Sequence, residues 1–157
     1  HDCTPAYNIY TGVHVICGAP VTNMPTTGTA PYSLAGATPA TIQPTTGGGT
    51  TAPGTFPGSM GVDFAGAKVG WTSSIAVGGV TYGFSSTGGA AAPSVALTAG
   101  GTFASNGTVT SPTATTSGTG YGFLAGAGAS QIGFGYFLHP IPSSGTTIAG
   151  VAAFTKD

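Results

Sequence analysis

Very few residues of this chain could carry acid–base or nucleophilic chemistry. Asp63 is the one carboxylate away from the chain ends, and it falls in a segment whose alternating residues predict a strand. General acid–base catalysis needs a second carboxylate or a positioned histidine close to the first group. The histidines are His1, His14 and His139, and none has an acidic partner that would complete a nucleophile triad. The sequence therefore predicts a protein that is not an enzyme.

The same histidines give no metal-binding pattern. A zinc site combines three or four ligands at recognisable spacing, and the chain contains neither Cys-x-x-Cys nor His-x-x-x-His. No metal and no cofactor are predicted. One binding hypothesis stays open, a haem-like or other planar hydrophobic ligand held by a histidine beside aromatic rings. The candidate residues for that ligand are His14, His139 and Tyr136.

The elements that must position these residues are strands, because the composition disfavours helices. Only five of the 157 residues are charged, with two Lys, three Asp, no Glu and no Arg, whereas about a quarter is typical of globular proteins. Good helix formers are replaced by 29 Gly, 12 Pro and many Thr and Val. Two cations cannot neutralise a phosphate backbone, so nucleic-acid binding is excluded. A net charge of −1 also leaves little repulsion between copies of the chain.

Cys3 and Cys17 are the two cysteines, and we expect them to form a disulfide. Closing so short a loop would contribute roughly 3 kcal/mol in the chain-entropy model. A disulfide in a chain so poor in charge indicates a secreted, extracellular protein. The chain starts without a signal-peptide pattern, so we expect it to begin after signal cleavage, and no apolar run predicts a transmembrane helix.

Alternating apolar residues divide the chain into a terminal extension, residues 1–22, and one domain, residues 23–157. Residues 38–57 read as a long, exposed and aperiodic loop rich in Thr, Pro and Gly. About eight strands emerge from nine alternating segments, which are 30–34, 60–64, 69–77, 80–84, 95–97, 103–109, 121–123, 132–138 and 148–154. We therefore predict an all-β fold with a single eight-stranded antiparallel barrel and a disulfide-stapled N-terminal extension. A β-sandwich is the alternative.

Three stretches carry a resemblance to a known family: MPTTGTAPYSLAGATP (24–39), the GTF…GTVT pattern (101–110) and residues 120–154. Together they resemble the small barrel module of the transferrin-binding-protein-B-like proteins, which also ends some secreted and FecR-type proteins of Gram-negative bacteria. The resemblance implies an eight-stranded barrel and export to or across the outer membrane. Its most specific residues are Phe123, Gly126, Ile132, Gly133, Tyr136, Ile148, Gly150 and Phe154.

Two functional hypotheses follow. In the first, the chain is an extracellular structural protein that packs with copies of itself into a fibre, sheath or matrix. The extension would then contact a neighbouring subunit by strand addition, with Tyr7, Ile9, Val13 and Val15 as buried anchors. The alternative for the extension is that residues 1–22 cover one end of their own barrel. In the second, it is a surface or secreted binding module for a small nutrient or haem-like ligand. Glycans are a possible addition, with Asn106 as the acceptor of the pattern Asn-Gly-Thr.

Overall fold

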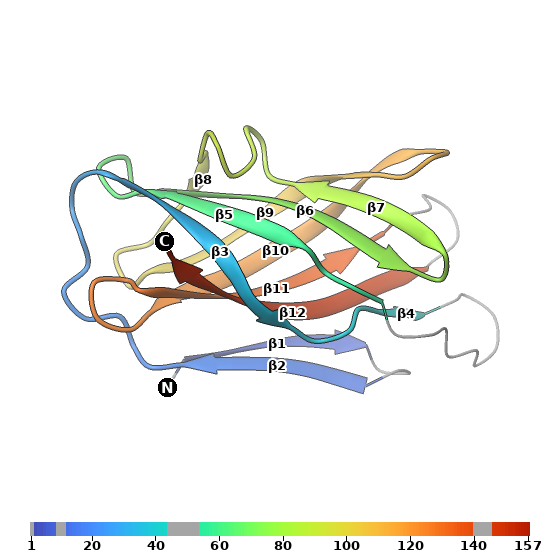
Figure 1. Ribbon diagram of the computed structural model, residues 1–157, viewed down its shortest axis with the longest axis horizontal. Coiled ribbons are helices and arrows are strands. Elements are labelled where there is room, and N and C mark those ends of the chain that lie inside the picture. Colours follow the sequence, from blue (N-terminus) through green and yellow to red (C-terminus); the bar gives the residue numbers. More distant parts are fainter. Residues whose placement is uncertain (1, 9–11, 44–53, 140–145) are drawn as a thin grey trace.

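Eight antiparallel strands of the chain close into a barrel (Figure 1). The computed structural model describes residues 2–8, 12–43, 54–139 and 146–157, and within these ranges it contains strands and no helix. Each barrel strand pairs with the next one along the chain, and β12 closes the ring between β11 and β3. The barrel strands are β3 (Thr29–Ala37), β5 (Gly58–Asp63), β6 (Lys68–Val77), β7 (Val80–Ser85), β9 (Thr102–Thr110), β10 (Thr115–Ala125), β11 (Gln131–Leu138) and β12 (Thr147–Lys156).

Two short strands complete this sheet. β4 (Thr41–Gln43) extends the pairing of β12, and β8 (Val95–Ala96) pairs with the start of β6. The predicted barrel is confirmed, and the β-sandwich alternative is not what the chain adopts. Closure gives every barrel strand two neighbours, which removes the exposed edges that a chain with so little charge could not otherwise protect.

The barrel interior is packed with aromatic side chains. Along β6 the buried residues alternate with exposed or partly exposed ones from Trp71 to Val77, which fixes the parity that faces inward. Phe134 lies at the centre, with its ring centroid 5.2 to 6.4 Å from those of six other aromatic residues. These neighbours are Phe56, Trp71, Phe84, Phe103, Tyr136 and Phe154.

The segment predicted as an aperiodic loop, 38–57, contributes to this core. Phe56 is only 4% exposed and stacks on Tyr136 with ring centroids 4.8 Å apart. The prediction of an exposed loop is therefore wrong for this residue, because backbone hydrogen bonds from Thr55 to Ala76 hold the segment against β6. Residues 44–53 of the same segment lie outside the described residues.

Two cross-strand pairs join an aromatic ring to a glycine. Phe123 lies opposite Gly133, and Tyr136 lies opposite Gly150. A Cβ atom at Gly133 would meet the Phe123 ring, and one at Gly150 would meet the Tyr136 ring and hydroxyl. The ring covers the backbone of its partner, which stabilises a glycine within a strand. These four residues belong to the set that carries the family resemblance, and their role is structural.

The extension forms a separate two-stranded sheet against the outside of the barrel (Figure 1). It consists of β1 (Asp2–Asn8) and β2 (Gly12–Gly18), and the predicted disulfide between Cys3 and Cys17 joins the two strands. This hairpin packs on the outer wall formed by β10, β11 and β12. It thus covers its own barrel. No helix within the described ranges is long and apolar enough to cross a membrane.

Candidate functional site: a groove beside the N-terminal hairpin

The three residues proposed for a haem-like ligand are not brought into one site. Tyr136 is fully buried inside the barrel, where desolvation raises the pKa of its hydroxyl. His14 belongs to β2 on the outside of the wall. His139 follows β11 and is exposed, with its backbone N–H donating to the carbonyl of Ser117. The barrel wall therefore separates Tyr136 from His14.

His14 fastens the hairpin to the barrel. Its Nδ1 lies 2.8 Å from Thr38 Oγ1 and its Nε2 lies 2.9 Å from Thr41 Oγ1. Both hydroxyls also lie within reach of β12 carbonyls, so each can donate to the ring or accept from it. Desolvation lowers the pKa of His14 below its ordinary value of 6.5. Both ring nitrogens are thus used in holding the hairpin, which leaves His14 a structural role.

Small residues let the hairpin approach the wall closely. Gly18 sits against Phe123 and Ala125, and a Cβ atom at Gly18 would lie 2.8 Å from the Phe123 ring and 2.9 Å from Ala125 Cβ. After the hairpin, the carbonyl of Ala19 accepts from Gly126 N, and that of Thr22 accepts from Gly128 N. These contacts fix the end of β2 to the turn between β10 and β11.

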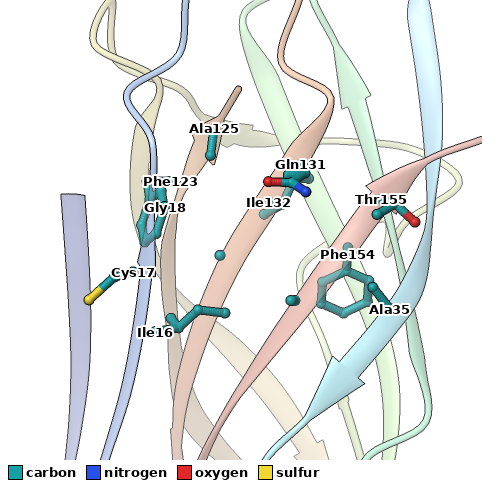
Figure 2. A pocket seen from close by; sticks show the side chains of 12 residues that line it. Ile16, Cys17, Gly18, Ala35, Phe123, Ala125, Gln131, Ile132, Phe154 and Thr155 are labelled. Carbon is teal, nitrogen blue, oxygen red and sulfur yellow. The ribbon is translucent and has the colours of Figure 1, made fainter. Parts of the chain in front are cut away.

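A groove runs along β2 where the hairpin meets β3 and β12, and we call it the hairpin groove. Its two adjoining hollows enclose about 90 Å³ and about 210 Å³. Figure 2 shows one of them, with Ile16, Cys17 and Gly18 on the hairpin side and Ala35 and Thr155 on the barrel side. The wall residues that line the two hollows are Ala35, Gly36, Ala37, Thr38, Phe123, Ala125, Gln131, Ile132, Gly133, Val151, Ala152, Ala153, Phe154 and Thr155.

No lining residue of the hairpin groove is charged, and most are Gly, Ala or Val. Ala35, Gly36 and Ala37 are exposed at the surface of β3. Sequence reasoning did not single out these residues as a site, although Gly, Ala and Thr recur on the parity opposite to the core. This recurrence of small residues was the sequence pattern that could have indicated the groove, because small uncharged residues on an outer face permit close approach of another chain.

The residues expected to anchor an assembly lie on the hairpin or outside the described residues. Tyr7 is paired with Val13, and Val15 is paired with Pro5. These positions share the parity of Cys3 and Cys17, so they belong to one face of the hairpin. Cys3 and Cys17 are exposed, and Val15 is 50% exposed. Ile9 lies outside the described residues.

Asn106, the glycan candidate, is exposed in β9, on a part of the wall that the hairpin groove does not include. Thr119 Oγ1 on β10 donates a hydrogen bond of 3.3 Å to Asn106 Oδ1. Glycosylation at this position stays a prediction.

The fold is similar to the barrels of transferrin binding protein B. A mutant of that vaccine antigen from Haemophilus parasuis superposes with a TM-score of 0.57 at 11% identity, over 90% of this chain and 29% of that one. The isotype 1 protein of serogroup B Neisseria meningitidis gives 0.53 at 11% identity, over 89% and 28%. An intact structure with both lobes gives 0.51 at 12%, over 91% and 30%. This chain therefore spans less than a third of each. No family model matches the sequence, and no curated protein does.

Proposed function

We propose that this chain, which has the barrel fold of transferrin binding protein B, is a non-enzymatic binding module outside the cell. It binds its partner on the outer wall, in the hairpin groove, and not within the barrel. The packed interior carries this proposal. Phe134 and its six aromatic neighbours occupy the space in which a barrel of this size would hold a small ligand.

An extracellular or cell-surface location fits the disulfide. A cross-strand bond between Cys3 and Cys17, both exposed, persists in an oxidising compartment and is lost in a reducing one. The solved proteins with this fold are named for binding transferrin.

Assembly of copies into a fibre has less support. That hypothesis used the extension as a clasp on a neighbouring subunit, whereas the hairpin lies on its own barrel and uses His14 to stay there. Self-association through the exposed face of the hairpin is an outcome that the hydrogen-exchange experiment can detect.

The test compares the wild-type chain with two matched variants, Ala37→Asp in the hairpin groove and Ala104→Asp on β9. Both alanines are exposed, and β9 lies four strands away from β3 around the barrel. Each protein is immobilised and exposed to the secreted and surface proteins of the producing cells. We expect a partner that wild type and Ala104→Asp retain and Ala37→Asp loses. Equal retention by all three would show that the groove is not the binding site.

A haemin titration followed by absorbance tests the small-ligand alternative. We expect no saturable shift of the Soret band, since the candidate residues lie on opposite sides of the wall. A saturable shift that disappears in Tyr136→Phe or His14→Ala would restore that hypothesis.

A further inference from the structure

Strand β2 has a free backbone edge that faces the hairpin groove. Among the described strands β2 pairs with β1 alone. The two hollows are lined by β2 together with β3, β10, β11 and β12, and none of the described lining residues belongs to β1, so the edge of β2 away from β1 borders them (Figure 2). The hydrogen bonds of His14 with Thr38 and Thr41 also lie on the side of β2 that faces β3 and β4. The groove thus combines an open strand edge with an apolar floor.

The pairing within the hairpin shows which backbone groups point into the groove. Val15 lies opposite Pro5, which has no N–H to donate, so this pair does not exchange hydrogen bonds. The Cα atoms of Cys3 and Cys17 are 4.0 Å apart, which also fits the closer, non-hydrogen-bonded type of pair. The N–H and C=O groups of Val13, Val15 and Cys17 therefore point away from β1, toward the groove.

We propose that the hairpin groove binds an extended, uncharged segment of a partner protein, which adds to β2 as a third strand of the hairpin. This rests on the proposed function and names the class of partner. Val13, Val15 and Cys17 would each contribute one N–H and one C=O, giving about six main-chain hydrogen bonds. The disulfide holds β2 extended before the partner arrives, which lowers the entropic cost of binding.

The lining defines the side chains that the segment can carry. A charged group over Ala35, Ala37 and Val151 would lose its water without gaining an ionic partner. Strand β2 itself, Gly12–Gly18, contains none of the Lys or Pro residues with which proteins protect exposed edges. The added strand would extend the layer that the hairpin forms on the wall, with small or β-branched residues facing Ala35 and Ala37.

A second copy of this chain does not fit the groove in the same way. Pairing β2 with β2 of a copy would place the two hairpin centres about 10 Å apart. Each hairpin rests on its own barrel, and an eight-stranded barrel has a backbone diameter of about 16 Å. In an antiparallel pair the outward groups of Val13, Val15 and Cys17 meet those of the copy, so both barrels lie on the same face of the joined sheet and would overlap. The geometry therefore favours a lone extended segment over antiparallel pairing with a second hairpin.

The first experiment uses a soluble, end-capped peptide of alternating valine and threonine, about nine residues long. N-methylation along one edge limits self-association of the peptide to a dimer and leaves the other edge free to pair with β2. The control peptide is N-methylated along both edges. Amide hydrogen exchange is measured on the intact, oxidised chain. At ten times the dissociation constant, the one-edge peptide should slow exchange at Val13, Val15 and Cys17 about tenfold, and the control should not.

Equal protection by both peptides, or by neither, would overturn strand addition. Protection of the same amides that rises with protein concentration in the absence of peptide would assign the edge to a second copy, which would also overturn the proposal.

The second experiment uses Val15→Pro, which removes the central outward N–H while the β1 pairing is retained. Val15→Ala is its matched control, because it shortens the side chain and keeps the N–H. We expect Val15→Pro to lose the peptide and Val15→Ala to retain it. Retention by both variants would overturn the proposal. The doubly methylated peptide decides the question without any variant if Val15→Pro fails to fold.

Failure of this inference is distinguishable from failure of the proposed function. A natural partner that Ala37→Asp loses and Val15→Pro retains would leave the groove as a binding site that uses side chains. A partner that neither variant loses would refute both.

Discussion

Removing the disulfide should release the hairpin and leave the barrel folded. Cys3 and Cys17 are separated by 14 positions, and for a loop of this size the chain-entropy model assigns roughly 3 kcal/mol to the bond. The contacts that remain include the two His14 hydrogen bonds, about 1 kcal/mol each, the backbone hydrogen bonds of Ala19 and Thr22, and the packing of Ile16 and Gly18 on the wall. The Cys3→Ser, Cys17→Ser double variant should therefore raise the undocked population by about two orders of magnitude.

The barrel should not share this loss, because none of the core residues comes from the part of the hairpin whose burial the structure describes. Native-state hydrogen exchange separates the two units, with the β2 amides that face β1, those of His14 and Ile16, reporting on the hairpin and those of β11 on the barrel. We expect β2 exchange to accelerate about a hundredfold and β11 exchange to stay within a fewfold of wild type. Equal acceleration in both strands would refute the argument, since it would show that hairpin and barrel unfold as one unit.

Three further predictions concern the His14 contacts that hold the hairpin on the barrel and the aromatic core of the barrel. Because the pKa of His14 is lowered when the hairpin docks, docking should be strongest above pH 6.5, weaken as the pH falls from 6.5 to the docked pKa, and level off below that pKa. Hydrogen exchange of the β2 amides that face β1, corrected for intrinsic rates, measures the docking equilibrium. Docking that does not change with pH would contradict the role of His14 in holding the hairpin. Phe56→Ala should lower the free energy of unfolding by about 3 to 5 kcal/mol in a urea titration, and a loss under 1 kcal/mol would place Phe56 outside the core. Gly150→Ala should cost about 1 to 3 kcal/mol by crowding Tyr136, whereas Gly36→Ala, which meets nothing within 4 Å, should unfold at nearly the wild-type urea midpoint.

Much of the fold could be predicted because its causes are local. Alternation with a period of two gave the strands that became β3, β5 to β12, and the loss of charged helix formers left no competing element. The pairing of Cys3 with Cys17 followed from there being only two cysteines. Phe56 was missed, since a single aromatic residue among Pro, Thr and Gly has no periodic neighbours to mark it as buried.

The candidate site was harder to predict, because it is made by contacts between distant segments. His14 and Tyr136 carry the residue types of a ligand site, yet one faces the outer wall and the other the barrel interior. The groove floor comes from Ala35, Ala37 and Val151, whose chemistry is unremarkable in each strand alone. Only their meeting beside β2 makes a surface.

The sequence by itself determined the strand content, the low surface charge and the disulfide, since each depends on composition or on residues close together in the chain. The tertiary structure alone decided which parity faces the core, because a period of two is the same for both faces of a strand. It also decided where the hairpin lies. That placement depends on Gly18 meeting Phe123 and on His14 meeting Thr38 and Thr41, contacts that exist only once β3, β10 and β12 have closed into a barrel.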